Sequence, residues 1–158
     1  MALKVLNESL SHISVLAEWI PKSSGPVLEL GVGIGSSPIL HELCRKRQLV
    51  SYENNAGYMY YFRRLKSDWH TIDYVEKWED APIDRRWGLA FIDVDPRGDR
   101  RKLMMRLKPW ADFIVVHDTE PKVDKYYHVR ELFDRWRYHK TYDEIVPSTT
   151  VLSDKREI

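Results

Sequence analysis

The chain contains little cysteine and no long apolar run. Its one cysteine, Cys44, cannot form an internal disulfide and excludes a cysteine-based metal cluster, which suits a reducing intracellular compartment. No apolar run approaches the roughly 20 residues of a membrane-spanning helix. Lys4, Asn7 and Glu8 stand where a signal peptide would be apolar. We therefore expect a cytoplasmic protein with no membrane partner.

Net charge is also nearly absent, because 25 Lys and Arg residues offset 24 Asp and Glu residues. No global field therefore attracts the protein to nucleic acid, which we consider an unfavoured partner. The local basic groups at 45–47, 85–86 and 97–102 are interleaved with acids, as on solvated helix faces. The length of 158 residues and the apolar content of 43% suit one core, so we predict a single domain over residues 1–158.

Short apolar runs alternate with helical patterns along the chain. Strands are predicted at 26–30, 49–53, 71–75, 87–93 and 112–117, and helices at 8–20, 36–47, 56–66, 100–107 and 126–138. A terminal hairpin is predicted from 142–146 and 149–152. The first helix should bury Leu10, Ile13, Leu16, Ala17 and Ile20, and end at Pro21. This alternation predicts a doubly wound, mostly parallel α/β sheet with helices on both faces.

The first predicted strand runs into a turn with glycines at alternate positions, Gly31, Gly33 and Gly35. Ligands bind beyond the carboxyl ends of the strands in a doubly wound sheet, and glycine lets the backbone turn sharply and approach a ligand closely. The dinucleotide pattern G-x-G-x-x-G fails because its last position is Ser36. Glu29 instead places an acid where a ligand with a cationic end would need one. A tight loop without a ligand is the alternative.

Residues 27–35, Val-Leu-Glu-Leu-Gly-Val-Gly-Ile-Gly, resemble the first motif of the class I S-adenosylmethionine-dependent methyltransferases. The resemblance implies a Rossmann-like, seven-stranded sheet with an antiparallel last strand, and a turn that holds S-adenosylmethionine. Glu53 ends the second strand, where this fold directs a carboxylate at ribose hydroxyls. Asp73 and Tyr74 resemble the adenine-contacting position of the family. The alternatives are that Glu53 is a solvated strand-end glutamate, that Asp73 caps a loop and that Tyr74 packs against the protein.

Acids also follow the fourth and fifth predicted strands, at Asp93, Asp95 and Asp118. These strand ends are neighbours in a doubly wound sheet. Methyl transfer is an in-line displacement, so an enzyme has to align the acceptor and ensure that it is deprotonated. The same positions resemble those of metal-dependent O-methyltransferases, which implies Mg²⁺ or Ca²⁺ held by Asp93 and Asp118.

The fifth strand departs from that pattern, because such families often have Asp-Asn or Glu-Asp where this chain has His117-Asp118. Two alternatives therefore stay open: a divalent ion activates the acceptor, or His117 acts as a general base without metal. Either way, Asp93, His117 and Asp118 are the predicted catalytic residues. Structural loop caps are the non-catalytic interpretation.

We therefore predict methyl transfer from S-adenosylmethionine to an oxygen of a small-molecule acceptor. The fourth strand lacks the Asn/Asp-Pro-Pro-Tyr/Phe pattern of enzymes that methylate nucleic-acid bases. The alternatives are a nicotinamide- or nucleotide-sugar-binding Rossmann enzyme and a non-catalytic cofactor-binding or scaffold module. Because only one helix precedes the first strand, a second subunit or the acceptor itself must exclude water. We favour a homodimer.

Overall fold

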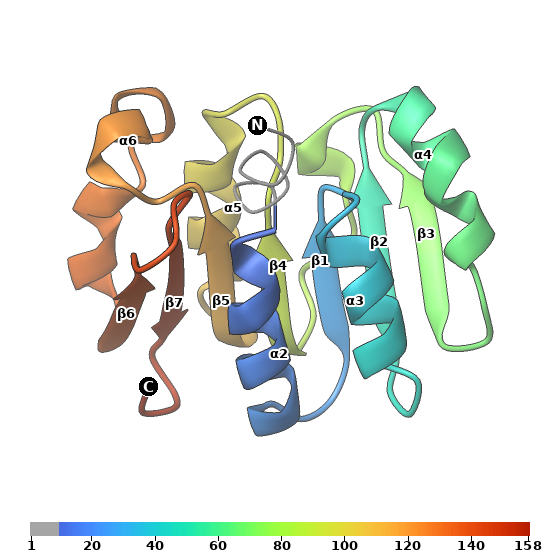
Figure 1. Ribbon diagram of the computed structural model, residues 1–158, viewed down its shortest axis with the longest axis horizontal. Coiled ribbons are helices and arrows are strands. Elements are labelled where there is room, and N and C mark those ends of the chain that lie inside the picture. Colours follow the sequence, from blue (N-terminus) through green and yellow to red (C-terminus); the bar gives the residue numbers. More distant parts are fainter. Residues whose placement is uncertain (1–9) are drawn as a thin grey trace.

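The computed structural model describes residues 10–158, which form one seven-stranded sheet flanked by helices (Figure 1). The strand order is β3-β2-β1-β4-β5-β7-β6. The first five strands pair in parallel, and β7 is antiparallel to both β5 and β6. The strands are β1 (Val27–Leu30), β2 (Leu49–Glu53), β3 (His70–Tyr74), β4 (Trp87–Ile92), β5 (Ala111–His117), β6 (Tyr138–Tyr142) and β7 (Thr149–Ser153). This confirms the predicted doubly wound sheet with an antiparallel last strand.

Helices follow most of the parallel strands, as predicted. They are α2 (His12–Lys22), α3 (Ser36–Leu43), α4 (Ala56–Phe62), α5 (Asp99–Leu107) and α6 (Pro121–Tyr127), with the 3-10 helices η1 (Arg63–Leu65), η2 (Trp78–Asp80) and η3 (Arg130–Arg135). In Figure 1, α2 and α3 lie side by side in front of the sheet, and α5 lies behind it. Within residues 10–158, no helix is both long and apolar enough to cross a membrane.

Both faces of the sheet are buried. Leu89 and Phe91 of β4 belong to the cluster formed with α2 and α3, whereas Ala90 and Ile92 belong to the cluster formed with α5 and η3. Successive residues of a strand point to opposite faces, so a central strand covered on both sides is apolar at most of its positions. This burial explains why the strong apolar run of β4 was recognisable in the sequence.

Helix α2 differs from its prediction in the face that it buries. The buried residues are His12, Val15, Leu16, Trp19 and Ile20. Of the predicted members, Ile13 is half-buried and Ala17 is exposed. The helix also continues through Pro21 to Lys22. The predicted start at residues 8 and 9 lies outside the described residues. The observed face turns His12 inward, toward the ends of the central strands.

The predicted helix at 126–138 is wrong. Helix α6 ends at Tyr127, because His128 adopts a left-handed conformation (φ 50°) and the Asp124 carboxylate accepts the N–H groups of Val129 and Arg130. The 3-10 helix η3 follows, and Tyr138 already begins β6. The predicted strand 142–146 is therefore mostly loop.

Candidate active site

The carboxyl ends of the central strands open into a cavity of about 450 Å³. Leu30 of β1 lies in register with Tyr52 of β2 and Ile92 of β4, so the residues that follow these three strands meet at one edge. The cavity is lined by six predicted site residues, namely Gly31, Gly33, Gly35, Glu53, Asp93 and Asp118. The structure therefore brings together most of the residues predicted from the strand-end rule.

The glycine turn is shaped by two close approaches. Gly31 has φ +89°, and a Cβ there would lie 2.1 Å from the carbonyl oxygen of Asp93. A Cβ on Gly35 would lie 2.9 Å from Nε2 of His12. At Gly33, by contrast, a Cβ would meet only the Ser36 hydroxyl, at 3.5 Å. Gly31 and Gly35 therefore permit packing of the protein on itself, whereas Gly33 leaves space at the cavity.

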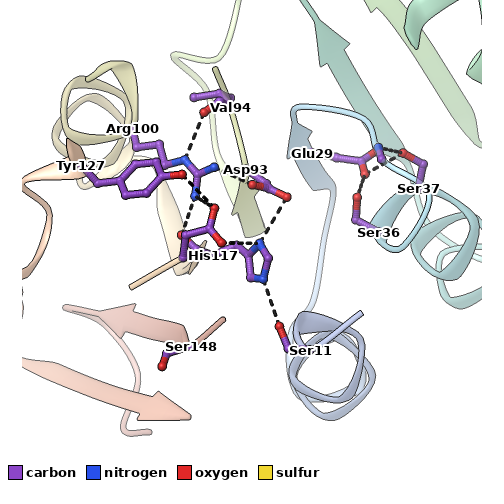
Figure 2. Close-up of polar contacts among 12 residues, drawn as sticks. Ser11, Glu29, Ser36, Ser37, Asp93, Val94, Arg100, His117, Tyr127 and Ser148 are labelled. Atoms are coloured by element: carbon purple, nitrogen blue, oxygen red, sulfur yellow. Dashed lines mark hydrogen bonds and ion pairs between the residues drawn. The ribbon is translucent and has the colours of Figure 1, made fainter. Parts of the chain in front are cut away.

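Glu29 lies beneath this turn and is 0% exposed. Its carboxylate accepts hydrogen bonds from the hydroxyls of Ser36, Ser37 and Ser51 at 2.6, 2.9 and 2.5 Å, the first two of which appear in Figure 2. Ser37 in turn accepts the N–H of Gly33. Burial raises the pKa of Glu29 to about 7, against the opposing effect of the serine hydrogen bonds. Glu29 is therefore withdrawn from the cavity and positions the turn, whereas the sequence predicted that it would face the cationic end of a cofactor.

Glu53 lines the cavity, as predicted. One carboxylate oxygen accepts the N–H of Val32 at 2.9 Å, and the other accepts the N–H of Asn55 at 2.7 Å. Burial raises the pKa of this carboxyl, and the backbone hydrogen bonds oppose that shift. The two bonds fix the orientation of the carboxylate and leave each oxygen a further lone pair for a ligand hydroxyl.

Asp73 and Tyr74 lie elsewhere. Asp73 is exposed and forms an ion pair with Lys66 at 3.5 Å. Tyr74 is 50% exposed and faces a groove beside α4. Since β3 is an edge strand and neither residue lines the cavity, the structure does not bring Asp73 and Tyr74 together with the other predicted site residues.

An arginine joins the two acids predicted to hold a metal, and its contact with Asp93 can be followed in Figure 2. The Arg100 guanidinium lies 2.6 Å from Oδ1 of Asp93 and 3.0 Å from Oδ2 of Asp118. It also donates to the carbonyl oxygens of Val94 and His117. Burial opposes ionisation of Asp93, but a hydrogen bond from His117 and the charge of Arg100 outweigh it and hold the pKa of Asp93 well below its usual range. Arg100 thus occupies the position of the cation predicted between Asp93 and Asp118.

His117 lies behind these carboxylates and is 5% exposed. Its Nδ1 is 3.4 Å from Oδ2 of Asp93 and 3.5 Å from Oδ1 of Asp118, and its Nε2 is 3.1 Å from the hydroxyl of Ser11. The contacts with Asp93 and Ser11 can be followed in Figure 2. His117 does not line the cavity, whereas His12 does. The structure therefore gives His117 contacts with the predicted catalytic acids, but not the direct exposure expected of a general base.

Two residues of the site were missed in the sequence. His12 was not counted in the apolar stripe of its helix, although it precedes Val15 and Leu16 at the spacing of a buried position. Arg100 was grouped with solvated bases, although it shares a helical face with Leu103, Met104 and Leu107. A polar side chain inside an apolar stripe was the signal in both cases.

No protein-family model matches the sequence, and no curated protein matches it. Solved structures do resemble the fold. The human methyltransferase 10 domain containing protein aligns with a TM-score of 0.63 at 11% identity, over 94% of this chain and 83% of that one. A Klebsiella pneumoniae structure described as an O-methyltransferase gives 0.63 at 14%, over 89% and 78%. A Staphylococcus aureus structure described as a caffeoyl-CoA O-methyltransferase gives 0.61 at 14%, over 88% and 90%.

Likeness at these identities concerns the fold, and it agrees with the strand order found here. All three proteins are described as methyltransferases. The chain therefore has the fold of the class I S-adenosylmethionine-dependent methyltransferases.

Proposed function

We propose that this protein binds S-adenosylmethionine in the 450 Å³ cavity and transfers its methyl group to an acceptor. The observation that carries the proposal is the convergence of the glycine turn and Glu53 with Asp93 and Asp118 on that cavity. The first two features suit a nucleoside-like ligand, and the carboxylates suit the place where an acceptor hydroxyl is held by hydrogen bonds.

The residues present fit the cofactor. Gly33 leaves open the space that a side chain would fill, and the buried Glu53 carboxylate is held by two backbone N–H groups beside that space. A carboxylate oriented in this way can accept hydrogen bonds from two ribose hydroxyls. When bound, S-adenosylmethionine would supply a methyl group on a cationic sulfur. The product S-adenosylhomocysteine is a neutral thioether, so its departure needs no protonation by an acid.

At the other end of the cavity, Asp93 and Asp118 would orient the acceptor. Arg100 keeps Asp93 ionised and holds both carboxylates in place, so they can accept a hydrogen bond from an acceptor hydroxyl and orient its oxygen. We propose an oxygen of a small molecule as the methyl acceptor, because a hydroxyl matches these acceptor-only groups. His117 acts through the carboxylates as a positioning residue.

Isothermal titration of S-adenosylhomocysteine tests the proposal, with NAD as the competing ligand. We expect micromolar binding to the wild type and to the surface control Glu42→Ala, but no binding of NAD. Glu53→Ala should weaken binding by roughly tenfold or more, as expected for lost hydrogen bonds to a charged group. Tighter binding of NAD, or no binding of the adenosyl compound to folded protein, would overturn the proposal.

A further inference from the structure

We propose that His12, Asp93 and His117 form a binding site for one divalent transition-metal ion. One ligand atom of each residue lies within 4.8 Å of those of the other two. His12 begins α2, whereas Asp93 and His117 stand at the ends of β4 and β5. Three separate elements therefore bring two imidazoles and a carboxylate together, with His12 and Asp93 on the cavity wall and His117 behind them.

The distances are close to those of a coordinated ion. Nδ1 of His117 and Oδ2 of Asp93 are 3.4 Å apart. Two ligand atoms bound to one tetrahedral ion at about 2.1 Å lie about 3.4 Å from each other. The pair from Asp93 and His117 is already at that separation, and His12 has to approach by at most about 1.4 Å to complete a three-ligand site.

Unsatisfied nitrogen atoms point to a missing ligand. His12 is 3% exposed, and within residues 10–158 neither of its ring nitrogens has a hydrogen-bond partner. The two imidazole rings meet edge to face, with centroids 4.5 Å apart. Buried polar atoms are nearly always satisfied in folded proteins, so both nitrogens of a buried ring without partners call for an occupant.

The surrounding contacts are those that orient metal ligands. Nε2 of His117 lies 3.1 Å from the Ser11 hydroxyl, and Oδ1 of Asp93 is bound by Arg100. Ligating histidines and carboxylates usually have their second polar atom held in this way. Nδ1 of His117 faces the carboxylates of Asp93 and Asp118, at 3.4 and 3.5 Å. A metal ion bound between Nδ1 and Oδ2 of Asp93 would take the place of a proton between these two atoms.

The ligand set selects the class of metal. Imidazole nitrogens favour ions such as Zn²⁺ and Co²⁺, whereas Mg²⁺ and Ca²⁺ prefer oxygen. The site thus differs from the predicted Asp93 and Asp118 site in both ligands and metal. The proposal that His12, Asp93 and His117 bind an ion depends only on the positions of these three side chains. Its use in catalysis rests on the proposed function: His12 and Asp93 line the cavity, where an ion could bind the acceptor oxygen and lower its pKa.

Titration of Co²⁺ into chelator-treated protein tests the site. We expect one equivalent to bind, with the visible absorption bands of a low-coordinate cobalt centre, and we expect Zn²⁺ but not excess Mg²⁺ to displace it. His12→Phe should abolish stoichiometric binding while filling the apolar space beside Phe91. His12→Asn provides a second variant of different size. The exposed His139→Gln is the matched control and should bind as the wild type does.

No stoichiometric cobalt in the wild type, or unchanged binding in both His12 variants, would overturn the metal site. S-adenosylhomocysteine titrations of the same proteins keep the two proposals apart. A wild type that binds cobalt but not the adenosyl compound supports the metal site and contradicts the proposed cofactor.

Discussion

Arg100 neutralises the acidic end of the cavity from a buried position. Its guanidinium contacts Asp93 and Asp118 and caps two backbone carbonyl oxygens. The neighbouring Arg101 faces outward and pairs with Glu131 at the surface. Consecutive arginines of one helix therefore have different energetic roles, because only the first is withdrawn from water.

Arg100→Met should lower the free energy of unfolding by about 3 kcal/mol or more, since it leaves two partly buried carboxylates without their counter-charge. Arg101→Met should cost less than about 1 kcal/mol, as is usual for a surface ion pair. Urea denaturation of both variants measures the difference. Equal losses would contradict the role assigned to Arg100.

Glu29 predicts a pH dependence. Burial raises its pKa from the ordinary value near 4.5 to about 7, so folding takes up a proton between these values. Its contribution to stability is fully present below pH 4.5 and is lost as the pH rises through about 7.

The variant Glu29→Gln keeps a neutral polar side chain at every pH. Urea unfolding from pH 5 to 8 should therefore show the wild type losing stability relative to this variant, by as much as about 3 kcal/mol. The other titrating groups are common to both proteins and cancel in the comparison. A difference that does not change with pH would show that Glu29 has an ordinary pKa.

At the residue scale, the sequence allowed prediction of groups that follow strands. The sequence placed Glu53, Asp93 and Asp118 at one site because strand ends converge at one edge of a parallel sheet, and all three line the cavity. The positions of His12 and Arg100 depend on how each helix is rotated against the sheet. Local sequence patterns indicate that rotation only when the buried stripe is wholly apolar.

The glycine turn between β1 and α3 makes separable predictions at the scale of the element. Gly31→Ala should destabilise the fold by about 2 to 3 kcal/mol, because it combines a left-handed backbone with a clash against Asp93. Gly33→Ala should change stability by less than about 1 kcal/mol but weaken S-adenosylhomocysteine binding roughly tenfold, or by about 1.4 kcal/mol.

Thermal unfolding and calorimetric titration distinguish these outcomes. Gly98→Ala is the matched control, since a Cβ at Gly98 meets nothing within 4 Å and its φ of −66° suits any residue. A Gly33→Ala protein that binds the adenosyl compound normally would show that the turn does not contact it.

The central strands were predictable and the C-terminal elements were not. Strands β1, β2, β4 and β5 are buried along their whole length, which makes each a largely apolar run with few polar residues. Edge strand β6 exposes His139 and Lys140 and so lacks that signal. The misleading apolar pair Ile145 and Val146 is exposed in the following loop.

At the scale of the whole molecule, the sheet order accounts for the position of the site. Strands β1 and β4 are adjacent, although β2 and β3 separate them in the sequence, and the chain changes direction across the sheet between them. Ligand sites of doubly wound folds lie at such a switch point. The homodimer and the small-molecule acceptor remain predictions.

The central claim is that the cavity binds the adenosyl cofactor. The most direct test is to titrate isotope-labelled protein with S-adenosylhomocysteine and to monitor the NMR chemical shifts of the backbone amides. The account predicts that the largest shifts fall at residues 31–35 and 53–55, around the cavity. Shifts confined to the groove beside α4 and Tyr74, or no shifts at millimolar ligand, would contradict it.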